Sequence, residues 1–250
     1  MNDTVALVTG AARGIGLATA ALFHAEGRRV VMLDRDAEEL AEAAATLPGA
    51  LPITCDVSIP QEVAQSIAEV AQTCGRLDVL VNNAGVADFG PLAETDFDRW
   101  RRVMATNLDG VFLMSQACLP LLSVRGGAIV NIGSISGLRA STLRIAYGTS
   151  KAAIIHLTKQ QAAELGEVGI RANCVCPGPV NTKLALAVHS PEIRAAYHDA
   201  IPLNRYGSER EIAEVICFLA GERASYVTGQ VVASDGGFDA TGVGLPALRS

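Results

Sequence analysis

Aromatic side chains, clustered basic residues and long apolar runs are all scarce in this sequence of 250 residues. Aromatic residues make up 4% of the chain, and the formal net charge is −6 with Lys and Arg scattered along it. A nucleic-acid-binding face needs clustered positive charge, so we expect no nucleic-acid partner. No apolar run reaches the ~18 residues of a membrane span, and no window resembles a signal peptide. We therefore expect a cytoplasmic protein that makes no membrane contact.

Clusters of metal-binding residues are also missing. The pair Cys174-Val175-Cys176 has no second group of Cys or His beside it that would complete a metal site. The sequence therefore predicts no metal centre. We expect the thiols to be small buried groups in a reducing cytosol, at Cys55, Cys74, Cys118, Cys174, Cys176 and Cys217.

The chain is rich in short apolar runs that alternate with helical periodicity. Such runs indicate strands buried on both faces, as in a parallel sheet. No linker or repeat interrupts them, which predicts an α/β chain whose residues 1–250 form a single domain, a doubly wound parallel sheet of about seven strands with helices on both faces. The expected strands are Val5–Val8, Arg29–Leu33, Leu51–Cys55, Leu77–Val81, Ala128–Ile132, Arg171–Cys176 and Gln230–Ala233. The first expected helix follows the glycine turn and ends near Gly27. Further helices are expected at 36–47, at 60–75, from 97 to about 122 and from 147 to about 165, and another is expected to begin near Ser208.

A glycine turn joins the first strand to its helix. Its spacing lets the backbone approach a pyrophosphate at the helix N-terminus. Asp34 ends the second strand 18 residues after Gly16. A carboxylate there accepts hydrogen bonds from the adenosine ribose and repels a 2′-phosphate, so NAD is expected and NADP is less favoured. Arg13 and Arg35 argue the other way, because either can pair with a phosphate. The turn contains Gly10, Arg13, Gly14, Ile15 and Gly16.

Small and polar residues follow three further strands. Open α/β sheets bind ligands outside the carboxyl ends of their strands. Asp56-Val57 suits the amino group and ring face of an adenine. Asn82-Asn83-Ala84-Gly85 fits the same crevice, although it is also an ordinary turn sequence. Ser134 follows the fifth strand, whereas Asn107 lies inside a helix and taken alone would be a solvated residue.

Tyr147 and Lys151 lie four residues apart at the start of an apolar periodic segment, so they share one helix face. A phenol is a poor base at neutral pH, and a fixed ammonium nearby favours the phenolate. Such a pair suits proton exchange with an alcohol or carbonyl oxygen. Most Tyr-x-x-x-Lys pairs are simply surface neighbours, so the pair needs support from the rest of the chain.

In this order and spacing, the motifs resemble the short-chain dehydrogenase/reductase family along essentially the whole chain. The resemblance implies a Rossmann-like fold and hydride transfer between a nicotinamide cofactor and a CH–OH group. One departure is Gly-Thr-Ser between Tyr147 and Lys151, where Ser-Ala-Ser is commoner. Arg13 occurs in NAD-using relatives and does not overturn Asp34. The matching residues are Thr9, Gly10, Gly14, Gly16, Asp56, Asn82 to Gly85, Asn107, Ser134, Tyr147, Lys151, Pro177-Gly178 and Asp235-Gly236-Gly237.

The resemblance assigns roles to these residues. Tyr147 would be the general acid in carbonyl reduction and the base in alcohol oxidation, and Ser134 would hydrogen-bond the reacting oxygen. Lys151 would hold the nicotinamide ribose, and Asn107 would fix a water linking Lys151 to solvent. The other implied cofactor contacts are Asp56 and Val57 at adenine, Asn83, Ala84 and Gly85 in the crevice, Pro177 and Gly178 after the sixth strand, and Val180 and Thr182 at the nicotinamide carboxamide. The family also implies a homotetramer or homodimer.

Substrate specificity is expected in parts the cofactor does not use. The segment 183–206 is a candidate lid, and its polar residues favour a small polar substrate such as a polyol, sugar or hydroxy acid. Arg139 and Arg144 flank the approach to Tyr147 in the sequence. Our hypothesis is that one of them binds an anionic group of the substrate, such as a carboxylate. The alternative is that each is an ordinary surface arginine or a subunit contact. The candidate substrate residues are Ser136, Arg139, Arg144 and His189.

Two other functions compete with an NAD-dependent alcohol dehydrogenase. An NADPH-dependent ketoreductase, including an acyl-carrier-protein reductase, is opposed by Asp34. A non-catalytic nucleotide-sensing subunit is opposed by the intact set of Ser134, Tyr147, Lys151 and Asn107.

Overall fold

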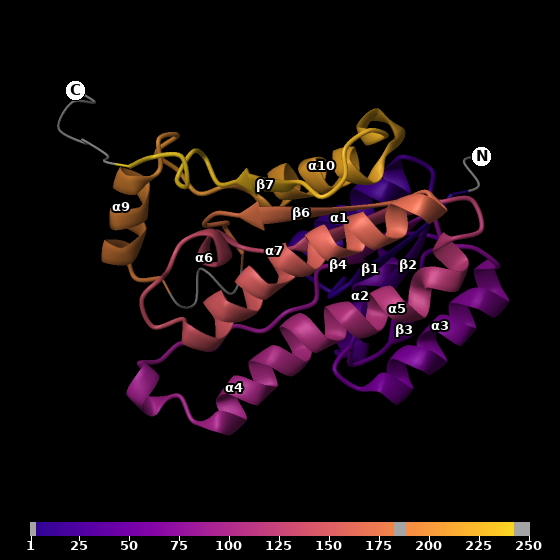
Figure 1. The fold of residues 1–250 in the computed structure, drawn as a ribbon, viewed down its shortest axis with the longest axis horizontal. Coiled ribbons are helices and arrows are strands. Elements are labelled where there is room, and N and C mark those ends of the chain that lie inside the picture. The colour runs from indigo at the N-terminus through magenta and orange to yellow at the C-terminus, as the bar shows by residue number, and fades with distance from the viewer. Residues whose placement is uncertain (1–3, 183–188, 243–250) are drawn as a thin grey trace.

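The computed structural model describes residues 4–182 and 189–242, which are built around one parallel seven-stranded sheet (Figure 1). Its strand order is β3-β2-β1-β4-β5-β6-β7, and every neighbouring pair is parallel. The predicted α/β class and doubly wound parallel sheet are confirmed. The strands are β1 Val5–Thr9, β2 Arg29–Asp34, β3 Leu51–Thr54, β4 Val79–Asn82, β5 Gly127–Ile132, β6 Ile170–Pro177 and β7 Val231–Ser234.

Helices cover both faces of the sheet because its central strands are apolar on both faces. On one face, α1, α2 and α10 contribute side chains such as Phe23, Leu40 and Ile216 to a common core. On the opposite face, Val70 of α3 and Met114 of α5 pack against the other side of the same strands. Figure 1 shows α7 beside α5 on this second face. The bounds are α1 Gly14–Ala25, α2 Ala37–Ala45, α3 Pro60–Cys74, α5 Gly110–Leu122, α7 Ile145–Leu165 and α10 Glu209–Ala220.

The strand order reverses between β1 and β4. The chain builds β1 to β3 on one side of this point and β4 to β7 on the other. At such a reversal the connections that follow two adjacent strands run to opposite faces of the sheet. A crevice forms between them, outside the carboxyl ends of the strands. Figure 1 shows α6 (Ile135–Leu138) and α9 (Pro191–Ala200) at this end of β6 and β7.

Several elements differ from the sequence expectation. The helix expected from Phe97 to about Leu122 comprises α4 (Phe97–Met104), a π-helical turn (Ala105–Asp109) and α5. A π-turn adds one residue to the helical repeat without altering its apolar character, so periodicity does not reveal it. α7 begins at Ile145, before Tyr147, and β4 spans Val79–Asn82 where Leu77–Val81 was expected. The short α6 and α9 were not expected.

A buried polar network connects the centre of the sheet to two helices. Asn82 donates from Nδ2 to Oδ1 of Asn131 at 2.9 Å, and Asn131 donates to Oε1 of Gln161 at 2.7 Å. Gln161 in turn donates to Oγ of Ser115 at 2.9 Å. These bonds fix β4, β5, α5 and α7 in one register, since a buried amide without partners is costly. Within residues 4–182 and 189–242, no helix has the length and apolarity to cross a membrane.

Candidate active site

The glycine turn between β1 and α1 is tightly folded. Gly10 and Gly14 have φ of +64° and +60°, a region that favours glycine. A Cβ on Gly16 would collide with the carbonyl oxygen of Gly10, and one on Gly10 would lie 2.9 Å from Cα of Ala84. The turn therefore brings the start of α1 to the carboxyl end of β1. The N–H groups of the first turn of α1, including that of Ile15, have no hydrogen-bond acceptor within the helix. They can therefore bind the oxygens of a pyrophosphate.

Asp34 lies against this turn at the carboxyl end of β2. Its Oδ2 accepts a hydrogen bond from the backbone N–H of Ala12 at 3.1 Å, and its Oδ1 accepts from that of Asp36 at 3.2 Å. Arg13 is engaged elsewhere: its guanidinium lies 3.2 Å from Asp36 and 2.6 Å from Glu39. The carboxylate is thus fixed beside the turn, and the arginine of the turn, Arg13, already pairs with two acidic side chains.

Asp56 and Val57 follow β3, beside the strand that carries Asp34. Asp56 accepts hydrogen bonds at Oδ1 from both the N–H and the hydroxyl of Ser58, at 2.9 and 2.7 Å. Arg35 lies 3.9 Å from its other oxygen. Val57 is buried, and its methyl group packs where a side chain on Gly110 would otherwise lie. The adjacent strands β2 and β3 therefore place three candidate adenosine contacts at the same sheet edge.

Thr9 connects the glycine turn to the end of β4. Its hydroxyl oxygen accepts hydrogen bonds from the backbone N–H groups of Asn83 and Ala84, both at 3.0 Å. The Asn83 side chain donates to the carbonyl oxygens of Thr9 and Gly10, also at 3.0 Å. Sequence reasoning gave Thr9 no role, although its position directly before Gly10 was the available signal. It positions Asn83, Ala84 and Gly85 along the crevice.

Lys151 is buried below Tyr147 on α7. Its side chain is 4% exposed, its Nζ donates to the carbonyl oxygen of Ile132 at 2.7 Å, and Nζ lies 5.8 Å from the centroid of the Tyr147 ring. An ammonium has three N–H donors, and within the described residues this one makes a single hydrogen bond. A Cβ on Gly85 would lie 3.6 Å from Nζ, so the glycine leaves room beside the ammonium. The vacant donors and this space fit the hydroxyls of a nicotinamide ribose.

Ser134 and Tyr147 belong to two helices that pack against each other. Ser134 caps the N-terminus of α6, and its Oγ accepts from the N–H of Ser136 at 3.1 Å. Its hydroxyl proton remains available to donate to another oxygen. Gly148 allows close contact, because a Cβ there would lie 3.0 Å from the carbonyl oxygen of Ser136. The start of α7, with Tyr147, is thereby held against the start of α6, with Ser134.

Asn107 lies in the π-helical turn and is fully buried. Its Oδ1 accepts from the N–H of Val86 at 2.8 Å, and its Nδ2 donates to Val86 O at 2.9 Å and to Ser150 Oγ at 3.0 Å. Ser150 donates onward to the carbonyl oxygen of Tyr147 at 2.7 Å. The same Oδ1 would lie 3.3 Å from a Cβ on Gly85, so Asn107 and Lys151 border one small space. The solvated position that the sequence allowed for Asn107 is wrong.

The chain after β6 returns to the same end of the sheet. Gly178 packs so closely on Asp235 that a Cβ would lie 2.7 Å from Cα of that residue. Val180 pairs with Gly207 in an isolated parallel bridge, and the N–H of Thr182 donates to the carbonyl oxygen of Val180 at 2.8 Å. Pro177 is the last residue of β6. Residues 183–188 of the candidate lid lie outside the described residues.

Arg144 directly precedes α7 and lies over two aromatic rings. Its guanidinium carbon lies 4.5 Å from the ring centroid of Phe89 and 6.0 Å from that of Tyr147. The N–H of Gly90 donates to the carbonyl oxygen of Leu143 at 3.0 Å, and Leu143 has a left-handed φ of +61°. The loop after β4 is therefore joined to the segment before α7, which fixes where Arg144 points.

Aromatic rings, scarce in the sequence, gather around the described part of the candidate lid. His189 stacks on Tyr197 with 5.4 Å between centroids, and its Nδ1 lies 3.0 Å from the hydroxyl of Tyr206. Tyr197 also contacts Phe238, whose centroid lies 6.0 Å away. Burial, followed by the positive charges of Arg144 and Arg194, lowers the pKa of His189. Sequence reasoning gave Phe238 and Tyr206 no role, because no local pattern shows that residues 197, 206 and 238 come together in the fold.

The remaining substrate candidates are placed differently from one another. Arg139 pairs with Asp239 at 2.8 Å and donates to the carbonyl oxygen of Thr241 at 3.1 Å, so its guanidinium is committed to the C-terminal segment. Ser136 is buried, and its hydroxyl lies 3.0 Å from that of Ser141. Among the four candidates, Arg144 and His189 are the two that share one cluster.

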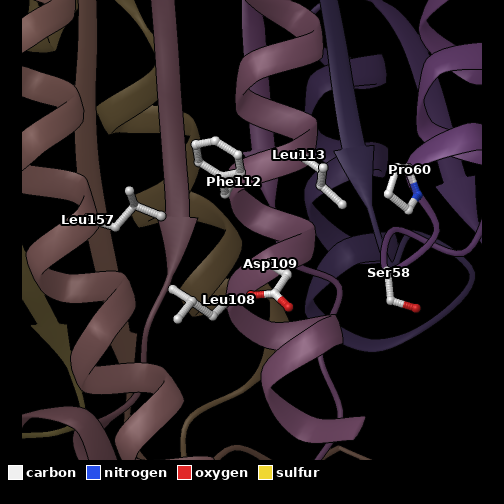
Figure 2. A pocket seen from close by; sticks show the side chains of 7 residues that line it. All are labelled: Ser58, Pro60, Leu108, Asp109, Phe112, Leu113 and Leu157. Atoms are coloured by element: carbon white, nitrogen blue, oxygen red, sulfur yellow. The ribbon is translucent and has the colours of Figure 1, made fainter. Parts of the chain in front are cut away.

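A separate hollow of about 480 Å³ lies on the face formed by α3, α5 and α7 (Figure 2). Figure 2 shows Phe112 between α5 and Leu157 of α7, with Leu113 directed toward Pro60. None of the residues discussed above as cofactor or catalytic candidates lines this hollow. Within the described residues, no three His, Cys, Asp or Glu side chains are grouped so as to hold a metal ion.

Known proteins resemble this chain over nearly its whole length. A family model described as enoyl-(acyl carrier protein) reductase matches residues 10–239. The 2-(R)-hydroxypropyl-CoM dehydrogenase of Xanthobacter autotrophicus is 41% identical over 94% of this chain and 98% of its own length. The meso-2,3-butanediol dehydrogenase of Serratia marcescens is 39% identical over 96% of each chain. A 3-oxoacyl-[acyl-carrier-protein] reductase of Thermotoga maritima is 40% identical, over 95% of this chain and 98% of its own.

A solved structure agrees with these sequence matches. A short-chain type dehydrogenase/reductase from Mycobacterium ulcerans superposes with a TM-score of 0.92 at 33% identity, covering 95% of this chain and 90% of that one. The chain belongs to the short-chain dehydrogenase/reductase family, and it is an oxidoreductase that acts on CH–OH groups.

Proposed function

We propose that this protein is an NAD-dependent dehydrogenase that interconverts a small polar secondary alcohol and its ketone. The family implies a nicotinamide cofactor. The observation that carries the proposal is the buried Lys151 ammonium, which the Ile132 carbonyl holds below the ring of Tyr147 and which keeps donors to spare. A surface Tyr–Lys pair would have neither the burial nor the anchor.

In the proposed reaction, Ser134 and Tyr147 hold the substrate oxygen. The nicotinamide, when bound, supplies the carbon that accepts or returns a hydride. During oxidation the Tyr147 oxygen takes the hydroxyl proton, while the Ser134 hydroxyl donates to the oxygen on which charge changes. Lys151 binds ribose hydroxyls through its remaining N–H groups. Asn107 holds the Val86 backbone and Ser150 in place beside them.

The preference for NAD rests on Asp34 and Arg13. The Asp34 carboxylate is anchored beside the glycine turn, where a 2′-phosphate would meet a like charge. The guanidinium of Arg13 is bound to Asp36 and Glu39 and is not presented to that phosphate. We assign the adenosine contacts to Asp34, Asp56 and Val57 on this basis.

An NADPH-dependent ketoreductase is the second candidate. It is favoured by Arg35, which follows Asp34 in the chain; its side chain is 60% exposed and its guanidinium lies 3.9 Å from Asp56. The similarity to an acyl-carrier-protein reductase is consistent with it. The exposed side chain of Arg35 is weaker support than the fixed carboxylate of Asp34, because a like charge near a phosphate weakens binding whichever conformation the arginine adopts.

Cofactor preference and direction are tested together. Purified protein is assayed at 340 nm with NAD⁺ or NADP⁺ on a panel of diols, polyols and hydroxy acids, and with NADH or NADPH on the matching ketones. We expect NAD⁺ to give the higher kcat/KM. Asp34→Asn should raise kcat/KM for NADP⁺ by about tenfold or more, because it removes a repulsive charge. The exposed Asp98→Asn is the matched control. A wild-type preference for NADP⁺ would favour the ketoreductase.

We also propose that the chain assembles as a homotetramer or homodimer in the cytoplasm. Phe112 is 50% exposed on the hollow between α5 and α7, an apolar face that a second copy of the same helices would cover. All six cysteines are free thiols, in keeping with a reducing compartment.

A further inference from the structure

Two arginines, Arg144 and Arg194, lie near the same pair of side chains in the candidate substrate region. Arg144 stands over Phe89 and close to Tyr147. Arg194, on α9, lies with its guanidinium carbon 4.6 Å from the ring centroid of Tyr206. Both act on the same two side chains, since each lowers the pKa of His189 and each opposes the rise that burial causes in the pKa of Tyr206. The two positive charges therefore converge on one spot.

Neither guanidinium has a carboxylate partner among the described residues. Arg194 donates from Nη2 to Oδ1 of Asn181 at 3.1 Å, but its Nη1 is buried with no hydrogen-bond partner. A buried donor on a charged group is destabilising when it lacks an acceptor. The segment 183–188 reads Lys-Leu-Ala-Leu-Ala-Val and contains no acidic residue that could supply one. The other site arginine, Arg139, contrasts with this pair because Asp239 neutralises it.

The surroundings of this arginine pair strengthen its attraction for an anion. The aromatic rings of Phe89, Tyr197, Tyr206 and Phe238 border the region, so the charges are partly removed from water. Electrostatic attraction is larger in such a setting than on an open surface. His189 supplies no negative charge that could neutralise the arginines. Its lowered pKa favours the neutral imidazole near pH 7.

The position of Arg144 links this charge to the reaction. It is three residues before Tyr147 in sequence and 6.0 Å from that ring, and the bond from Gly90 to Leu143 fixes its backbone. A small molecule whose anionic group binds at Arg144 can therefore place its hydroxyl at Tyr147 at the same time.

We infer that Arg144 and Arg194 together bind an anionic group on the substrate, so that the alcohol oxidised here carries a carboxylate, sulfonate or phosphate a few atoms from the carbinol carbon. This inference rests on the proposed function and narrows its substrate class. Both arginines are positioned to bind two anionic oxygens, which guanidinium groups do with paired N–H donors.

The test compares four alcohols that share one secondary hydroxyl: 1,3-butanediol, 3-hydroxybutyrate, 3-hydroxybutane-1-sulfonate and 3-hydroxybutyl phosphate. We expect at least one anion to exceed the neutral diol in kcat/KM by tenfold or more, and the preferred anion identifies the group. Arg144→Leu and Arg194→Leu should each lower kcat/KM for that anion by about tenfold to a hundredfold, mostly through KM. For the diol the change should stay below about threefold. Arg223→Leu, which removes an exposed arginine stacked on Phe218, is the matched control.

Binding measured without turnover separates this inference from the proposed function. Calorimetry with each alcohol added to the protein–NADH complex should show tighter binding of the anion, and either leucine variant should abolish that advantage. If the diol is oxidised as well as every anion and both variants affect all four equally, the anion site is refuted while the dehydrogenase proposal stands. If no alcohol is oxidised but arginine-dependent anion binding persists, the proposed function fails and the anion site stands.

Discussion

The side chain of Lys151 makes its key contact with a backbone oxygen on another element. Residue spacing places Lys151 one helical turn from Tyr147, but the carbonyl oxygen of Ile132 on β5 holds the ammonium in place. That hydrogen bond keeps a charged group buried that otherwise prefers water. Ser134 lies two residues after Ile132, so one strand end supplies both the anchor for Lys151 and the candidate catalytic Ser134. Disturbing this strand end would affect both.

Removal of the Tyr147 hydroxyl is expected to cause the largest loss of turnover of any single substitution. Tyr147→Phe should lower turnover by at least about 10²-fold, since positioned proton transfer contributes roughly 10²–10⁴. NADH binding, followed by its fluorescence on titration, should stay within about twofold, because the phenyl ring still fills the site. Tyr226→Phe is the control, as that tyrosine is fully exposed. Retained turnover in the Tyr147 variant would refute the assigned mechanism.

At the scale of elements, α10 supports the cofactor turn. It packs against α1, and its first residue, Glu209, has a carboxylate oxygen 3.6 Å from where a Cβ on Gly14 would lie. A capping box fixes its start: Ser208 Oγ accepts from the N–H of Glu211 at 3.2 Å, and Glu211 accepts from the Ser208 N–H at 2.8 Å. Arg205 also donates to Glu211, at 2.6 and 2.9 Å. These contacts hold the helix that backs the glycine turn.

The capping box predicts a pH-dependent stability. Hydrogen bonding from Arg205, and then from Ser208, lowers the pKa of Glu211 to about 2. A carboxyl whose pKa is lower in the folded state stabilises the fold fully above its unfolded pKa, near 4.5, and loses that contribution as pH falls toward 2. The difference in unfolding free energy between wild type and Glu211→Gln should therefore be constant above about pH 5 and shrink below it. Urea unfolding at several pH values measures it.

Two further variants check this interpretation. Ser208→Ala should cost about 1 kcal/mol of stability at neutral pH, as cap losses typically do. Glu214→Gln changes an exposed carboxylate on the same helix, whose contact with Arg210 is a surface pair at 3.4 Å, and should leave stability nearly unchanged. If the loss of unfolding free energy in Glu211→Gln does not diminish at acidic pH, the charge of Glu211 is not the source of the stabilisation.

At the scale of the whole molecule, chemistry and assembly occupy different surfaces. The candidate site lies at the carboxyl ends of the strands, whereas the hollow with Phe112 lies on the flank formed by α3, α5 and α7 (Figure 2). Because α7 carries Tyr147 and Lys151 near its start and Leu157 further along, one helix contributes to both surfaces. A subunit contact on this flank would therefore stiffen the helix that carries the catalytic pair.

Phe112→Asp should disrupt the assembly. A charge at the centre of an apolar contact costs desolvation without a partner, so subunit affinity should fall by about tenfold or more. Sedimentation velocity across a concentration series measures the species present. Val168→Asp introduces the same charge at an exposed apolar residue of a turn and should leave the assembly intact. A monomeric wild type at micromolar concentration would contradict the proposed oligomer.

The fold was largely predictable because its strands are continuous apolar runs and its turns are marked by glycine. The alternation of elements predicted the parallel sheet, and the glycine turn, Asp34 and the Tyr–Lys pair predicted one site at one end of it. The missed elements share a physical cause. The π-turn at Ala105–Asp109 leaves the apolar pattern intact, and α6 is too short to show a period. α9 buries none of its residues, so it has no apolar stripe for the sequence to reveal.

The sequence by itself determined the layered fold and the residues of the reaction, since apolar periodicity and glycine spacing act over a few neighbouring positions. Only the tertiary structure decided which charges remain available at the site. Arg13 and Arg139 are neutralised by acidic residues distant in sequence. Arg144 and Arg194 each lie over an aromatic ring and have no such partner among the described residues. Charge pairing depends on distances between elements that fold together, and no local pattern in the chain records those distances.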